Sequence, residues 1–409
     1  MELREEERRA VAGARIALPK VVALCLVFLV VGLFLGATSQ FIMGPVGATI
    51  LSRLGLPVDP NVARLLAVQN LVLDTHLNPR LDPNEMMENA VRGLLSRVDG
   101  GLTRYENPEE ARRTAERATG EFTGIGVTVR MVEEQVQIES VFRGTPAQGA
   151  GLLPRDIIVS VDDQTLRGLT LHEVTDRIKG PAGTNVTLTI FRPALGRTMD
   201  VTITRARIVV PVVSYEVVEP GIAHVILTQF TTTATEQMRT TLTALEQQGI
   251  KHLLLDLRFN PGGFTHVAED IASFFLGPDY VVYQTIDREG VVRQTKTRGE
   301  RIYTGRITVL INQGSASASE LLTGALRDHL HTPVLGVTSF GKGTIQQGYP
   351  LGDGSRVWVT VQGYKTPAGT VIDGKGITAD VVIEQPDPAA PEDVQLARAL
   401  QHIRDNLLR

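Results

Sequence analysis

Strands and helices alternate along the second half of the chain, and this alternation constrains the fold more than any other feature. After residue 206, short apolar runs typical of buried strands are followed by longer segments with helical spacing. The predicted strands are 222–230, 252–258, 307–311 and 333–338, and the predicted helices are 233–249, 266–277 and 319–329. This alternation favours a mixed α/β core (α+β mixed) over residues 206–385.

The preceding region, residues 119–205, has a different pattern. Short runs that alternate at period two, or are apolar throughout, are separated by Gly and Pro turns. These predicted strands are 124–131, 136–141, 156–163 and 186–192, with one helical stretch at 169–180. The chain has 409 residues, which fits two or three domains at roughly 150 residues each. We therefore predict a small β-domain before the α/β core.

Helical patterns flank these two domains. Residues 60–118 show apolar positions at spacings of three and four, and we predict an N-terminal helical region there. The segment 386–409 begins with a Pro-rich joint and continues as an amphipathic C-terminal helix. The sequence leaves open whether the N-terminal helices contribute to a homo-oligomer.

An uncharged run dominates the N-terminal end. Residues 21–52 carry no charged side chain, and the apolar part, 21–44, can cross a hydrocarbon core of ~30 Å as a helix. Several Lys and Arg precede it, whereas only Arg53 and Arg64 follow within about twenty residues. This asymmetry predicts a transmembrane signal-anchor at 21–44, with residues 1–20 in the cytoplasm and the remainder outside it. The alternative is a cleaved signal peptide, which would give a secreted or periplasmic protein.

Composition excludes several other classes of protein. The net charge is −4, from 41 basic and 45 acidic residues, with no concentrated basic segment, so we predict no nucleic-acid partner. The single cysteine, Cys25, excludes an intrachain disulfide and a cysteine-based zinc site. It lies inside the apolar run, where it is expected to be a small membrane residue.

Two motifs carry candidate catalytic side chains. In GSASASE (314–320) a predicted strand leads into a helix rich in small residues, and free amides at a helix N-terminus favour developing negative charge. Three serines compete there, Ser315, Ser317 and Ser319, and any of them can instead be an N-cap. In FGKGTIQQ (340–347), Lys342 stands between two glycines; a buried lysine with a lowered pKa can act as a general base.

Two further motifs offer backbone amides. LDLRFNPGG (255–263) ends a buried strand in a tight turn that can form an oxyanion hole, although an ordinary turn has the same residues. FTGIG (122–126) places two glycines before a strand, where consecutive amides can hold a carboxylate and the strand edge can pair with a peptide. Together with the downstream segment GTPAQGAGLLPRDIIVSVDDQ (144–164), about eighty residues resemble a PDZ domain.

Along the chain, the PDZ-like segment is followed by LDLRFNPGG, then GSASASE, then FGKGTIQQ. This order resembles the carboxyl-terminal processing (tail-specific) protease family, and the resemblance covers residues 60–409. The resemblance implies a serine endopeptidase that cuts proteins near their C-termini and needs no metal or other cofactor; with the predicted anchor at 21–44, the enzyme would be held in the membrane. It implies Ser317 as nucleophile, Lys342 as general base and Gln346 as the residue that orients the lysine. The chain departs from the family at Phe259, where a smaller or polar residue is usual.

The same resemblance assigns the binding groups. The amides of Ala318 and Gly263, with Gly263 favoured over Gly262, are the expected oxyanion donors. The PDZ segment is expected to bind the C-terminal tails of protein substrates. Its peptide-binding residues would be Gly124, Ile125, Gly126, Val127 and Val129.

Two other interpretations compete with this one. A Ser-His-Asp arrangement would need one of the histidines near the motifs, namely His266, His329 or His331, although none stands in a matched position. A catalytically silent PDZ adaptor would bind exposed C-termini without cutting them. Retention of both Ser317 and Lys342 favours the enzyme.

Overall fold

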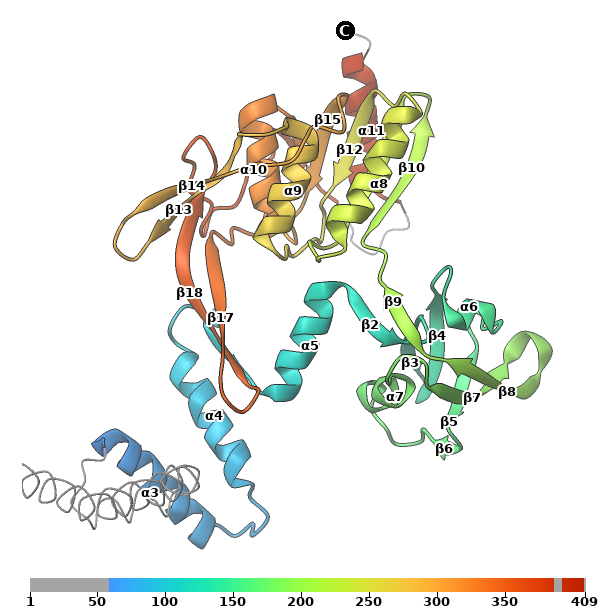
Figure 1. Ribbon diagram of the computed structural model, residues 1–409, viewed down its shortest axis with the longest axis vertical. Coiled ribbons are helices and arrows are strands. Elements are labelled where there is room, and N and C mark those ends of the chain that lie inside the picture. Colours follow the sequence, from blue (N-terminus) through green and yellow to red (C-terminus); the bar gives the residue numbers. More distant parts are fainter. Residues whose placement is uncertain (1–58, 386–391, 408–409) are drawn as a thin grey trace, which may run out of the picture. The chain divides into compact units, whose positions relative to one another are not determined.

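Figure 1 shows a computed structural model, which describes residues 59–385 and 392–407. The predicted segments 1–20 and 21–44, and residues 386–391 of the predicted 386–409 segment, lie outside these ranges. None of the helices within the two described ranges has the length and apolar character needed to cross a membrane. The chain divides into two units after Leu94, and each is described by itself.

The described part of the first unit, from residue 59 onward, contains two helices. Helix α3 (Pro60–Thr75) is capped by Asp59, whose side chain accepts a hydrogen bond from the Asn61 N–H at 2.7 Å, as N-cap residues do. Helix α4 (Pro83–Leu95) follows after a short connection. The Gln69 side-chain amide donates to the Pro83 carbonyl at 2.7 Å and ties the two helices together.

A six-stranded sheet forms the centre of the second unit (Figure 1). In spatial order its strands are β10 (Val213–Glu219), β11 (Ile222–Leu227), β12 (His252–Asp256), β15 (Arg306–Ile311), β16 (Val334–Gly336) and β19 (Val381–Val382). The β10–β11 pair is antiparallel and the remaining pairs are parallel. The predicted mixed α/β core is therefore confirmed.

Helices bury both faces of this sheet, which explains why the middle residues of its central strands β12 and β15 are mostly apolar. Helices α8 (Ala234–Gln247), α9 (Thr265–Leu276) and α10 (Ala318–Leu330) pack on one face, with Leu253 and Leu255 of β12 in the same core. The intervening Leu254 points the other way, because side chains alternate along a strand, and packs with α11 (Val394–Leu407).

A second sheet has five strands: β1 (Arg104–Glu106), β13 (Val281–Asp287), β14 (Val292–Lys296), β17 (Thr344–Pro350) and β18 (Arg356–Lys365). Strand β1 lies inside the region that we predicted to be helical, 60–118. Arg104 pairs with Trp358 of β18, more than two hundred residues away in the sequence. Local periodicity carries no signal for such a pairing.

The PDZ-like segment folds as an antiparallel sheet with two helices. Its strands are β3 (Val127–Val132), β4 (Gln135–Val141), β5 (Ile157–Val161), β6 (Gln164–Thr165), β7 (Asn185–Arg192) and β8 (Arg197–Thr204), and its helices are α6 (Pro146–Gly149) and α7 (Leu171–Ile178). Ile138, Leu188 and Ile190 are fully buried in its own core. Strand β2 (Glu121–Gly124) pairs with β9 (Ala206–Val209) where the chain enters and leaves it.

Helix α5 (Pro108–Thr119) precedes this domain. Asn107 and Glu110 form a capping box at its start, each side chain accepting from the other residue's main-chain N–H. Gly120 ends it in the left-handed conformation that glycine adopts without strain.

Candidate active site

Three loops meet at the carboxyl ends of β12 and β15, the edge of a parallel sheet at which ligands usually bind. The turn 258–263 follows β12, and the segment 312–317 follows β15. The Ala316 N–H donates to the Asn260 carbonyl at 3.0 Å, which joins these two. The third loop, 339–343, is held by the Phe340 N–H, which donates to the Ser315 carbonyl at 2.9 Å.

The structure distinguishes the three candidate serines. The Ser315 hydroxyl donates to the Leu257 carbonyl at 2.7 Å, and the Ser319 hydroxyl donates to the Asn260 carbonyl at 2.9 Å. Both serines are completely buried and hold neighbouring loops in place. Ser317 keeps 8% of its surface exposed, and its hydroxyl donates to no main-chain carbonyl of the described residues.

Ser317 also has an unusual backbone. Its φ is +56° and its ψ is −115°, at the N-cap of α10. Non-glycine residues rarely adopt such angles, and strained residues of this kind gather at functional sites. The sharp turn brings the serine to the N-terminus of a helix, where the peptide dipoles stabilise negative charge.

Two backbone amides beside Ser317 lack an acceptor. Among the described residues, neither the Ala318 N–H nor the Gly263 N–H makes a hydrogen bond. The Gly262 N–H donates instead to the Asn260 side-chain oxygen at 2.9 Å. A Cβ on Gly262 would lie 2.8 Å from the Cβ of Ser317, so glycine is required for this close approach.

Glu320 links the loop that carries Ser317 to the loop that carries Lys342. One of its oxygens, Oε2, accepts from the main-chain N–H of Ser317 at 2.7 Å and from that of Lys342 at 3.0 Å. The other, Oε1, accepts from the Ser339 hydroxyl at 2.6 Å and the Gly341 N–H at 2.7 Å. Sequence analysis assigned this residue no role, although Ser317 and Glu320 have the spacing of a capping box.

The environment of Lys342 favours its neutral form. Burial lowers the pKa of Lys342, and the nearby Arg104 guanidinium lowers it further, while Glu320 opposes them. No hydrogen bond or ion pair engages its ammonium group within the described part of the chain. Its main-chain carbonyl accepts a hydrogen bond from the phenol of Tyr364.

A buried ionic cluster fixes the turn that carries Gly263. Burial alone would raise the pKa of Asp256, but hydrogen bonds from His224 and Arg258 hold it below its usual range. Arg258 also binds Asp393, just before α11, at 2.8 Å. Phe259, within this turn, has a φ of +58° and is 72% exposed.

The remaining predicted residues have other partners. The Gln346 amide donates to the hydroxyls of Thr344 at 2.9 Å and Thr360 at 3.2 Å, and none of its hydrogen bonds within the described residues reaches Lys342. His266 stacks on the Phe264 ring, and His329 hydrogen-bonds to a carbonyl of β13.

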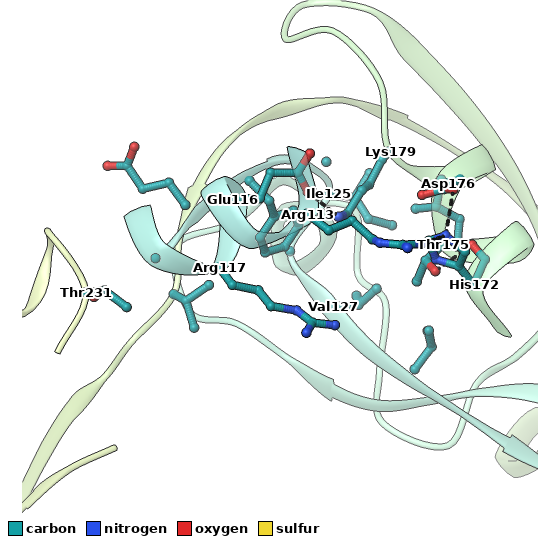
Figure 2. Close-up of a pocket in the computed structure, with 18 of the residues that line it drawn as sticks. Arg113, Glu116, Arg117, Ile125, Val127, His172, Thr175, Asp176, Lys179 and Thr231 are labelled. Carbon is teal, nitrogen blue, oxygen red and sulfur yellow. Dashed lines mark hydrogen bonds and ion pairs between the residues drawn. The ribbon is translucent and has the colours of Figure 1, made fainter. Parts of the chain in front are cut away.

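The PDZ domain has a groove between β3 and α7, shown in Figure 2, that encloses about 420 Å³. Ile125, Gly126, Val127 and Val129 line it, as does Gly124. The N–H groups of Ile125 and Gly126 make no hydrogen bond among the described residues.

Helix α5 lies along this groove, which sequence analysis did not predict. Arg113 and Arg117 point into it (Figure 2). The Glu116 carboxylate binds Lys179 at 2.8 Å, and His172 of α7 contacts both Glu109 and Arg113. Charged side chains of α5 therefore contribute to the surface that a bound peptide would meet.

Fold and site together define a serine peptidase with a peptide-binding domain, and comparison with known proteins identifies its family. Residues 221–383 match the Peptidase family S41, and residues 137–192 match a PDZ domain. A carboxy-terminal-processing protease of Bartonella bacilliformis is 37% identical over 312 residues, covering 75% of this chain and 71% of the relative. The chain belongs to this family of carboxy-terminal processing serine proteases, as the motifs predicted.

Other relatives agree. A carboxyl-terminal-processing protease of Synechocystis is 35% identical over 341 residues, covering 81% of this chain and 80% of the relative. A solved structure of a putative S41 protease from Bacteroides fragilis has a TM-score of 0.50 at 13% identity, covering 83% of this chain and 97% of that one. The last likeness concerns the fold alone.

Proposed function

We propose that this protease cuts with a Ser317–Lys342 dyad. The observation that carries the proposal is the shared carboxylate of Glu320, whose Oε2 binds the main-chain N–H of both residues and so fixes the two loops against each other. The lowered pKa of Lys342 supports its role as the base. Loss of proteolysis in Ser317→Ala is the test.

The chemistry follows from these positions. Neutral Lys342 removes the proton from the Ser317 hydroxyl, which attacks the scissile carbonyl. The amides of Ala318 and Gly263 donate to the oxyanion that forms, since neither has an acceptor within the described part of the chain. The lysine then gives its proton to the leaving amine, and water hydrolyses the acyl-enzyme.

Gln346 is proposed to orient the lysine through its carbonyl oxygen. Its amide nitrogen donates to two threonine hydroxyls, Thr344 and Thr360, which fixes the side chain and leaves Oε1 as an acceptor. An ammonium group has three hydrogens to donate and no acceptor of its own. A hydrogen bond from the Lys342 amine to Gln346 Oε1 would hold the lysine in place whether the amine is neutral or protonated.

Substrate tails are proposed to bind in the PDZ groove. The free amides of Ile125 and Gly126 are suited to an α-carboxylate, and the edge of β3 can pair with an extended peptide. Val127, Val129 and Ile178 are among the side chains that line the groove and offer it an apolar surface beside the charged residues of α5. Tails that end in small or branched apolar residues should therefore bind best.

This proposal predicts that amidation of a peptide's C-terminus weakens binding. Removal of the charge and one acceptor should cost roughly 1.5–3 kcal/mol, or about ten- to a hundred-fold in affinity. The measurement is fluorescence anisotropy with the full-length Ser317→Ala protein, comparing a peptide that ends in Ala-Val with its amide. Equal affinities would show that the FTGIG loop does not bind a carboxylate.

We further propose that residues 21–44 anchor the protein in the cell membrane with its catalytic part outside the cytoplasm. The uncharged run and the preceding Lys and Arg residues support this orientation. A reporter that requires export should be active when fused after Arg409, and removal of residues 1–44 should give a soluble, folded protease. A fusion that is active only with a cytoplasmic reporter would contradict the orientation.

A further inference from the structure

A second pocket opens at the opposite end of the central sheet from Ser317. It encloses about 680 Å³ between the first residues of β12 and β15, the end of α10 and helix α11. The catalytic loops leave the other ends of the same two strands. At a rise of about 3.3 Å per residue, β15 separates the two sites by roughly 20 Å.

Basic side chains dominate this pocket. Arg301, Arg306, His252, His331 and His402 line it, and no Asp or Glu is among the described residues that do so. Neither guanidinium forms an ion pair with any described carboxylate; Arg301 only donates its Nε–H to the Tyr303 carbonyl at 3.0 Å. The carboxylate nearest to the lining is that of Glu246, which accepts from the main-chain N–H and the hydroxyl of Thr304 and forms no ion pair with either arginine.

His252 supplies an independent observation. It is only 6% exposed, and its Nδ1 has no hydrogen-bond partner within the described residues, whereas its Nε2 lies 2.9 Å from the Thr308 hydroxyl. Buried polar atoms are rarely left unpaired, because the loss of water is then uncompensated. When Thr308 donates to Nε2, Nδ1 carries the hydrogen and can donate it to an anion.

The local potential is positive. Burial lowers the pKa of His252 to about 4, and the charges of Arg306 and His402 contribute to the lowering. Arg306 pairs in register with His252 on the neighbouring strand, so the strand pairing fixes the guanidinium and the imidazole beside each other. A guanidinium fork matches the oxygens of a phosphate group and binds it through paired hydrogen bonds.

We propose that this pocket is a binding site for a phosphate-class oxyanion, held by Arg301 and Arg306 with His252, His331 and His402 around it. The same chemistry occurs in free phosphate and in the headgroup of an anionic phospholipid. Binding would take place on the face of the protease core remote from the catalytic loops. The inference does not depend on the identity of the nucleophile.

The test is isothermal titration of the full-length protein in detergent with inorganic phosphate, against sodium chloride at the same ionic strength. We expect saturable binding with a Kd of about 0.1–1 mM. Arg301→Gln and Arg306→Gln should each weaken it about tenfold or more. Arg167→Gln, an exposed arginine of the PDZ domain, is the matched control and should bind as the wild type does.

A second arm separates the two sources of the ligand. Dihexanoyl phosphatidic acid is titrated in place of phosphate, with dihexanoyl phosphatidylcholine as its control. If only phosphatidic acid binds, the proposed site exists and its ligand is a lipid headgroup. If inorganic phosphate binds, the proposed site exists and accepts a small phosphate ligand. Absence of binding in both arms, or equal affinities in wild type and both Gln variants, would overturn the proposal. Circular dichroism establishes that the variants are folded.

Discussion

Replacement of Ser317 by alanine is expected to abolish proteolysis while leaving the fold intact. The loss in kcat/KM should reach at least ~10⁴-fold, because removal of a covalent nucleophile leaves only substrate binding and the oxyanion donors. Ser315 and Ser319 cannot substitute for it, since both are buried and their hydroxyls donate to main-chain carbonyls. The measurement is cleavage of casein by the purified protein, with circular dichroism as the fold control.

Two comparison variants sharpen this experiment. Ser214→Ala changes an exposed serine of β10 and should cleave as the wild type does. Ser319→Ala removes one buried hydrogen bond, so it should lower the free energy of unfolding by about 1 kcal/mol yet retain catalysis. Full activity in Ser317→Ala would place the nucleophile elsewhere and refute the dyad.

Replacement of Lys342 by arginine is expected to be nearly as damaging, by at least roughly 10³-fold in kcat. A guanidinium stays protonated at any working pH and cannot accept the serine proton. Burial and the Arg104 charge lower the pKa of Lys342, and they would also act on an arginine at this position. The arginine would nevertheless stay protonated and provide no base. Lys251→Arg, at an exposed lysine, is the matched control.

The pH dependence of the wild type checks the same role by another route. The catalytic form is the neutral amine, so activity should rise as the pH rises toward the pKa of Lys342. Because burial lowers that pKa, the rise should occur below the range of an ordinary lysine, ~10.4. A flat profile from about pH 6 to 9 would argue against lysine as the base.

The core could be predicted from sequence because its signals are local. Strand β12 is a run of apolar residues between turns, and the helices on either side of it have their own periodicity and stop signals. Each motif that identified the family is also a contiguous stretch of residues, so the motifs and their order along the chain were sufficient to predict the family. Strand β1 was missed because a three-residue strand is stabilised by β18, far along the chain, and not by its own pattern.

The sequence by itself determined the class of core, the family and the short list of catalytic candidates. Only the tertiary structure decided which of the three serines has a hydroxyl that does not donate to a main-chain carbonyl among the described residues. That depends on which loops meet at Asn260. It also revealed that Glu320 binds the loops of Ser317 and Lys342, and that α5 borders the PDZ groove. These facts depend on distances between segments that are remote in the chain, and a pattern of neighbouring residues does not encode such distances.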